Sequence, residues 1–224
     1  MMLDTTSSHE TVQCDTWRSV ICRLLALCAT PLIAGCAYTV RPPVHVADPT
    51  TVYLVDYGDT SRLWLPKDDN NAFVEWGYGD WRWYAKDQQS YLYGSIVFFW
   101  PTPGTLARRE HDFGPLGADG NMLWELDGYA TTIHEIDVER SDASELLVEL
   151  ESRFDRQRDS EIYNLNRRMY FVKDASSYWL GHQSSSVMAG WLRKLGCRVS
   201  GFAVVADFRV RAPGRTAHLQ TRKE

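Results

Sequence analysis

The chain has 224 residues, with 24 Lys and Arg against 29 Asp and Glu, which gives a formal net charge of −5 at pH 7. No basic patch interleaved with aromatic side chains is present, so nucleic acid is excluded as a predicted partner. No Cys and His residues recur at metal-ligand spacing, and the sequence predicts neither a metal site nor a cofactor.

An apolar segment near the N-terminus has the pattern of a bacterial lipoprotein signal. Leu24–Ala34 follows two arginines, and about eleven mostly apolar residues match a signal h-region and fall short of the roughly 20 needed to span a bilayer. The run Leu-Ile-Ala-Gly-Cys ends at Cys36, whose thiol is the only group there that can be lipidated. We therefore predict a signal peptide at residues 1–35 and lipid (palmitate among it) on Cys36. The alternative is a short buried core helix, interrupted at Pro31.

The flanks of this segment bear on where the leader starts and where the protein resides. Asp4, Glu10 and Asp15 do not fit a basic n-region, whereas initiation near Val20 would leave a short, normal leader. Ala37 in place of Asp favours the outer membrane, at its periplasmic face, if the source has two membranes. The sequence thus predicts an exported protein whose partner is a membrane, through its lipid anchor.

The remaining chain divides into a tether, a domain and a tail. Residues 36–49 hold the lipidated Cys and a Pro-containing tether, which reaches at most roughly 45 Å if fully extended. Residues 50–210 are predicted to form one α+β domain, and residues 211–224 form a polar tail that is expected to fray.

Short β-rich runs punctuated by Gly and Pro predict the strands of the domain. The runs are Thr51–Val55, Leu63–Leu65, Ala72–Trp76, Ala130–Val138, Met169–Val172 and Gly201–Val210. The Gly58-Asp59 pair predicts a hairpin turn between the first two, and Gly77–Asp80 predicts a tight turn after the third. Tyr91–Trp100 is apolar and of ambiguous type, and it ends at the Pro-Thr-Pro-Gly of 101–104.

Two helices are predicted from amphipathic spacing. Asp142 with Glu145 resembles a capping box before the first, and Ser184–Leu195 forms the second, with Gly196 placed to cap its C-terminus. Strands and helices mix without regular βαβ alternation. The predicted fold class is therefore α+β, a single domain with a mostly antiparallel sheet packed against two main helices.

Two spots could carry chemistry. One is the turn at 57–61, and the other is 182–186 at the start of the last helix, where unpaired N–H groups could hold an oxyanion or lower a nucleophile's pKa. The alternative is that the serines there are helix caps. Asp80 is a further candidate, or else a turn former whose carboxylate bonds local backbone.

Four landmarks give the chain a resemblance to a known family. They are Val52–Pro66, GYGDWRWY at Gly77–Tyr84, the Pro-Thr-Pro-Gly of 101–104 and YWLGHQSSSVMAGWLRKLG at Tyr178–Gly196. They occur in the order found in an uncharacterised bacterial lipoprotein family first noted in urease gene regions, a domain of unknown function. That family's pattern, Gly-x-His-Thr early and Asn-Cys-Asn late, resembles a circularly permuted papain-like or NlpC/P60-like arrangement.

The resemblance implies a catalytic pair that this chain lacks. Thr60 stands where the family has His, and Ser184 stands where it has Cys. Thr cannot act as a general base near neutral pH, and a lone Ser hydroxyl is a poor nucleophile. His182 lies two residues from Ser184, a separation at which helix side chains do not face each other, and His134 is the other possible base.

The aromatic residues and the last cysteine each have a structural and a functional interpretation. Trp76, Trp81 and Trp83 could form a sugar-binding platform, although aromatic side chains are more often core. Cys197 has no partner for a disulfide once the leader is removed, and we interpret it as a small buried hydrophobe.

The preferred functional prediction is a membrane-anchored envelope protein that is not an enzyme, with a degenerate papain-like site and a binding or structural role, for example toward peptidoglycan. The alternatives are a serine- or cysteine-type hydrolase acting on an envelope substrate, and an aromatic-platform carbohydrate-binding module.

Overall fold

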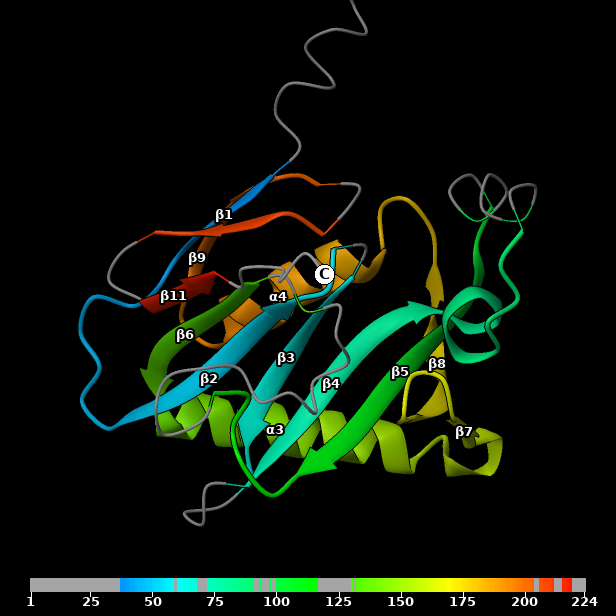
Figure 1. Ribbon diagram of the computed structural model, residues 1–224, viewed down its shortest axis with the longest axis horizontal. Coiled ribbons are helices and arrows are strands. Elements are labelled where there is room, and N and C mark those ends of the chain that lie inside the picture. The colour runs from blue at the N-terminus through cyan, green and yellow to red at the C-terminus, as the bar shows by residue number, and fades with distance from the viewer. Residues whose placement is uncertain are drawn as a thin grey trace, which may run out of the picture. The chain divides into compact units, whose positions relative to one another are not determined.

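A large antiparallel sheet organises the fold (Figure 1). The computed structural model describes residues 37–58, 60–67, 72–90, 93, 97, 100–116, 130, 132–203, 206–211 and 215–218. Ala37–Glu224 is one compact unit and Met1–Cys36 another. The predicted signal peptide, its cleavage point and Cys36 lie outside the described residues.

The sheet has the strand order β11-β6-β2-β3-β4-β5-β8-β7, and each neighbouring pair is antiparallel. Its strands are β2 (Pro49–Asp56), β3 (Ser61–Pro66), β4 (Phe73–Asp80), β5 (Thr102–His111), β6 (Thr132–Glu139), β7 (Ile162–Asn164), β8 (Met169–Tyr178) and β11 (Arg215–His218). The predicted α+β class with a mostly antiparallel sheet is confirmed. The β2–β3 hairpin is confirmed too, with Gly58 at φ +87° in its turn.

One face of the sheet is covered by two helices. They are α3 (Arg140–Asp155) and α4 (Ser184–Lys194), and their apolar sides pack on Leu54, Leu63, Trp76 and other strand residues of the main core. Gly196, at φ +77°, follows α4 as predicted. The capping box on α3 is wrong, because the helix begins earlier and Asp142 lies inside its first turn. The Glu139 side chain there accepts the backbone N–H groups of Ala47 and Asp48 instead.

The strand β4 runs through the segment predicted as a tight turn. Gly77–Asp80 is extended and pairs with β5 up to Asp80–Gly104. The glycines serve packing here: a Cβ on Gly79 would come within 2.9 Å of the Tyr84 ring. Pro101 directly precedes β5, and Pro103 lies within its first residues, where the pairing with β8 shifts register between Pro103 and Thr105. Trp81–Ala85 forms a short π-helical turn, and most of residues 91–99 lie outside the described residues.

A second, three-stranded sheet corrects the predicted tether and the predicted last strand. Its order is β10-β1-β9, formed by β1 (Tyr38–Arg41), β9 (Arg198–Gly201) and β10 (Phe208–Val210). Residues 38–41 are therefore folded rather than a free tether, because Tyr38 and Val40 are buried in the main core. The run Gly201–Val210 is not one strand, since the chain leaves β9 at Gly201 and re-enters the sheet at Phe208. Part of the predicted polar tail is also ordered, because Arg215–His218 pairs with β6.

The tryptophans predicted as a platform are mostly core. Trp76 is fully buried against Phe154 of α3, and Trp81 is buried beside Ala107 and Phe171. Trp83 is half-buried. A platform of three exposed coplanar rings at these positions is therefore wrong.

The thiol of Cys197 is buried, as predicted. Burial raises its pKa to about 12, so the thiolate is scarce near neutral pH. We expect Cys197 of purified Ala37–Glu224 to react with iodoacetamide only after unfolding, and mass spectrometry of alkylation against urea concentration measures this. Rapid labelling in buffer at pH 8 would contradict the buried placement.

Candidate functional site

The sequence-predicted residues are distributed over the helix-covered face of the sheet and its ends. Asp80 ends β4, Ser184 begins α4, and His182 lies in the loop between β8 and α4. Thr60 precedes β3 and is buried, and its hydroxyl has no hydrogen-bond partner in the described part of the chain. The Ser185 side chain is also buried, and its hydroxyl likewise has no hydrogen-bond partner among the described residues.

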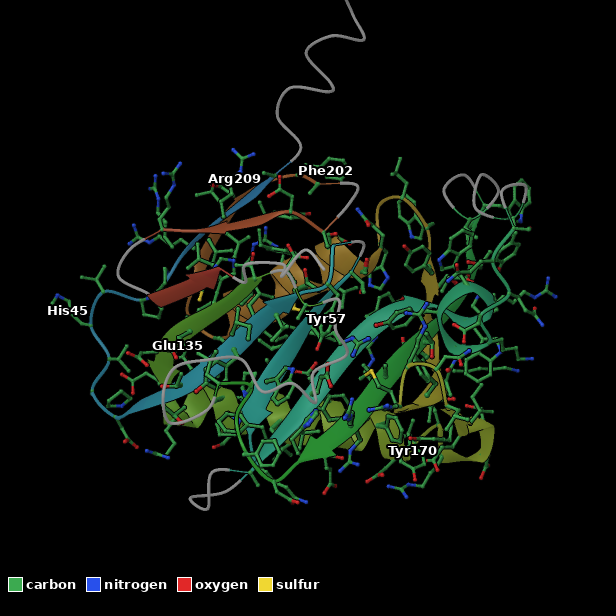
Figure 2. All side chains as sticks on the ribbon, viewed as in Figure 1. His45, Tyr57, Glu135, Tyr170, Phe202 and Arg209 are labelled. Carbon is green, nitrogen blue, oxygen red and sulfur yellow. The ribbon has the colours of Figure 1, made fainter. Side chains whose placement is uncertain are left out.

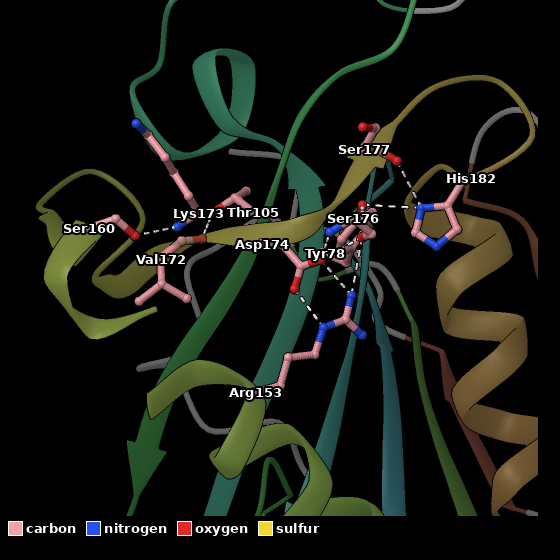
Figure 3. A network of polar contacts seen from close by, with 10 residues as sticks. All are labelled: Tyr78, Thr105, Arg153, Ser160, Val172, Lys173, Asp174, Ser176, Ser177 and His182. Carbon is pink, nitrogen blue, oxygen red and sulfur yellow. Dashed lines mark hydrogen bonds and ion pairs between the residues drawn. The ribbon is translucent and has the colours of Figure 1, made fainter. Parts of the chain in front are cut away.

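Strand alternation gathers polar side chains at one end of this face. Tyr78 of β4, two residues before Asp80, lies on the same face as Ser176 of β8, and their hydroxyls are in contact. Arg153 of the covering helix α3 donates to the same Ser176 hydroxyl. We call Tyr78, Arg153, Asp174, Ser176 and His182 the polar cluster (Figure 3). The helices α3 and α4 thus meet the sheet over hydrogen-bonding side chains here and over apolar ones elsewhere.

The cluster is anchored by a buried ion pair. The Arg153 Nε and Nη2 atoms each lie 2.6 Å from an oxygen of Asp174, whose side chain is 1% exposed. The backbone N–H of Ser176 donates to the same carboxylate at 2.7 Å. Burial alone would raise the pKa of Asp174, but the bonds from Arg153 and Ser176 outweigh it and hold that pKa below its usual range. Asp174 is therefore ionised at neutral pH.

A hydrogen-bonded chain leads from this carboxylate to His182. The Ser176 hydroxyl donates to Asp174, and the Tyr78 hydroxyl lies 2.9 Å from the Ser176 oxygen. His182 Nδ1 lies 3.2 Å from the Tyr78 oxygen and 3.0 Å from the Ser177 carbonyl. A carbonyl can only accept, so this geometry places the proton on Nδ1. Burial raises the pKa of Tyr78 well above its usual value, which keeps the phenol protonated and donating.

Ser184 has a different partner. Burial raises the pKa of Tyr178, and hydrogen bonds from the Ser184 hydroxyl and backbone N–H lower it in part. The Ser184 hydroxyl and backbone N–H thus both lie near the Tyr178 hydroxyl. Among the interactions of the described residues, none joins Ser184 to His182. The serine-cap alternative holds only for Ser186, whose hydroxyl accepts the N–H of Gln183 at 2.9 Å.

Asp80 acts as a cap. Its carboxylate accepts the backbone N–H groups of Arg82 and Trp83 at 2.9 and 2.8 Å, together with the hydroxyls of Tyr93 and Thr102. The turn-former alternative is correct for this residue in the sense that its carboxylate bonds local backbone. Asp80 lies beside the polar cluster and its oxygens are engaged by four donors.

His134 lies away from the cluster. It is buried on β6, opposite Leu54 of β2 and Thr216 of β11. Three strand spacings separate β6 from β4, which is roughly 14 Å. The structure therefore brings Asp80, His182 and Ser184 to one end of the sheet and leaves His134 elsewhere.

A second buried polar network on the opposite face was not predicted. Arg62 Nη1 lies 2.8 Å from Glu75 Oε1, and His111 Nε2 lies 2.9 Å from Glu75 Oε2. The Tyr57 hydroxyl donates to Glu75 at 3.0 Å, and the Arg62 guanidinium lies 4.2 Å above the Tyr57 ring centroid. Burial alone would raise the pKa of Glu75, but the Arg62 charge and His111 lower it to about 2. The sequence does contain a sign of this network: Arg62 and Glu75 each stand as a single charged residue inside an apolar strand run, SRLWLP and FVEWG.

Two surface hollows on the described part of the chain lie apart from the polar cluster. One, lined among others by Lys67, Arg108 and Glu151, holds about 780 Å³ and is open to solvent. Within the described ranges, no group of three His, Cys, Asp or Glu side chains could hold a metal ion, and no helix there is long and apolar enough to cross a membrane.

Comparison of the chain with models of protein families, with curated proteins and with solved structures finds no match.

Proposed function

We propose that this protein is a lipid-anchored component of a bacterial envelope that binds cell-wall material, of the peptidoglycan class, and does not hydrolyse it. The anchor is the predicted lipid on Cys36. The binding region is the polar cluster together with the exposed Trp179 beside it. The observation that carries the proposal is the engagement of Ser184 and His182 by tyrosines instead of by each other.

That engagement supports a protein without hydrolase activity. A serine nucleophile needs a base within hydrogen-bond reach of its oxygen. The contacts of Ser184 lead to Tyr178, and those of His182 lead to Tyr78 and Ser177. A phenol with a raised pKa cannot accept the serine proton near neutral pH. The rival hydrolase would require His182 to swing its open Nε2 toward Ser184.

Binding is favoured by an exposed aromatic ring beside the cluster. Trp179 is 47% exposed and bridges back to His182 through backbone bonds of 3.3 and 2.8 Å. Its ring lies directly over Gly181, where a Cβ would come within 2.3 Å of it. The ring therefore packs on the backbone at Gly181, while nearly half of the side chain stays exposed. An aromatic face beside hydrogen-bonding side chains suits a sugar ring.

Calorimetric titration of purified Ala37–Glu224 with muropeptides tests the binding. We expect Trp179→Ala to weaken affinity about tenfold or more, the effect typical of a central aromatic contact. Tyr170→Ala removes an aromatic ring of similar exposure, 46%, on β8 and is expected to leave affinity unchanged. Equal affinity in both variants and the parent protein would contradict the proposed surface.

The same muropeptides, followed by mass spectrometry, distinguish binding from hydrolysis. We expect no product with the parent domain. Turnover that disappears in Ser184→Ala would overturn the non-catalytic assignment and establish the hydrolase. The anchor is tested separately in the full chain expressed in bacteria, where palmitate labelling should occur in the parent protein and vanish in Cys36→Ser.

A further inference from the structure

The outer face of the small β10-β1-β9 sheet carries an unusual concentration of arginine. Tyr38 and Val40 point into the core, so alternation directs Thr39 and Arg41 outward. The register places Ser200 opposite Thr39, and Arg198 opposite Arg41. Parallel pairing brings Arg209 beside Thr39.

Arg211 extends this row, because its backbone N–H donates to the Val40 carbonyl at 2.8 Å. We define the arginine face as Arg41, Arg198, Arg209 and Arg211, all of them exposed. The side chains that alternation places on this face are these four and two hydroxyls, and none is acidic. Asp207 contacts Arg209 from the side at 3.5 Å, and both of those side chains are largely exposed, where an ion pair contributes little.

The arginine face opposes the charge of the rest of the protein. The whole chain carries a formal net charge of −5, yet Arg41 and Arg198 stand directly opposite each other on antiparallel strands. Like charges in such a pair destabilise a sheet. A bound anionic surface would offset this repulsion, because it neutralises both guanidinium groups at once.

The position of the face in the chain identifies the anionic surface. The carbonyl of Ala37 lies against Gly201 of β9, and the Tyr38 N–H donates to the backbone carbonyl of Asp207 at 2.8 Å. The chain is thus held to this sheet one residue after Cys36. Two residues span at most about 7 Å, so a lipid on Cys36 would bring the small sheet to the bilayer surface.

An exposed aromatic residue completes the arrangement. Phe202 is 46% exposed and directly follows β9. Figure 2 shows Phe202 and Arg209 at the edge of the molecule that carries β1. Arginines beside an exposed aromatic ring are typical of protein surfaces that lie on anionic bilayers.

We propose that the arginine face, with Phe202, binds the anionic headgroups of the membrane in which the protein is anchored. This inference rests on the proposed lipid anchor for its geometry, but it concerns a surface of the folded domain. The domain would then carry two membrane signals, a lipid chain and a basic patch, the combination that makes anchoring stable.

Vesicle co-sedimentation of unlipidated Ala37–Glu224, a compact unit with its own core, tests the proposal without the anchor. We expect binding to vesicles of phosphatidylcholine with 30% phosphatidylglycerol (about one lipid in three, to give the negative surface potential), and not to phosphatidylcholine alone. Binding should fall as NaCl rises, because salt screens exposed charges. Each arginine contributes about fivefold to partitioning, so Arg198→Gln/Arg209→Gln should weaken it about 25-fold.

The control is Arg156→Gln/Arg158→Gln, which removes the same charge from exposed positions after α3. It should leave vesicle binding within about twofold of the parent protein, and thermal melts verify that both variants fold. Equal losses in the two variants, or equal binding to neutral vesicles, would overturn the proposal. So would tight binding to polyphosphate that anionic vesicles fail to compete away, since the face would then be a site for soluble polyanions. The palmitate labelling of the full chain tests the lipid anchor alone. A failure of the anchor can therefore be told apart from a failure of the arginine face.

Discussion

Replacing Glu75 with Gln is expected to lower the free energy of unfolding by about 3–5 kcal/mol, the usual cost of breaking a buried ion pair from one side. The Arg62 and Glu75 side chains are 4% and 0% exposed. Glutamine has nearly the same shape, so the loss comes from leaving the Arg62 charge buried without its counter-ion. Urea unfolding of Ala37–Glu224, followed by tryptophan fluorescence, measures it.

The double variant Arg62→Met/Glu75→Leu separates this cost from a general intolerance of substitution. Replacing both charges by apolar groups is often neutral for stability, so we expect most of the loss to be recovered. If the double variant is less stable than Glu75→Gln alone, the desolvation explanation is wrong.

The pH dependence of stability follows from the same pair. The pKa of Glu75 falls from an ordinary value of 4.5 to about 2 on folding. Its contribution is therefore complete above pH 4.5 and is lost as pH falls from there toward 2, because only the unfolded state takes up the proton in that window. The slope of stability against pH over this window should be smaller in Arg62→Met/Glu75→Leu than in the parent protein.

Replacing Asp174 with Asn should cost about 2–3 kcal/mol. This is less than for Glu75 because the Arg153 side chain, at 23% exposure, keeps some water when its partner is removed. The substitution also removes the carboxylate to which Ser176 donates, so the chain through Tyr78 to His182 loses its anchor. We therefore expect muropeptide affinity to fall together with stability.

Asp155→Asn is the matched control for this variant. Asp155 pairs with Arg158 near the end of α3, but both side chains are more than half exposed. Exposed pairs contribute roughly 0–1 kcal/mol, so stability and binding should hardly change. Equal losses for Asp155→Asn and Asp174→Asn would show that burial of the ion pair is not what matters.

The strands that alternate or carry apolar runs could be predicted from sequence, and so could the two long helices. The errors have local causes. Gly77 and Gly79 suggest a turn, but in β4 they make room for the ring of Tyr84, which no local pattern reveals. The strand β1 is short and precedes two prolines, so it resembles a linker, and only partners more than 150 residues later in the sequence, β9 and β10, make it a strand.

Only part of the candidate site could be predicted from the sequence. The serines after His182 indicated a helix start, and α4 begins at Ser184, but nothing in the sequence placed Asp80 beside them. The contacts that decide its chemistry come from Arg153, Asp174 and Ser176, which are ordinary surface-type residues in the sequence. The bulge between β5 and β8 and the placement of α3 bring them together, and both depend on tertiary packing.

The strand β1 also constrains when the domain can fold. It lies between β9 and β10 in the small sheet, and β11 pairs with β6. The first strand of the domain to be synthesised therefore has no sheet partner until the chain has been made as far as Gly201, and its second partner follows at Val210. Pairing across so long a separation is slow, because the loop between the partners must close first. The strand β1 would thus stay unpaired for most of the synthesis of the domain, while hairpins such as β2–β3 can already form behind it.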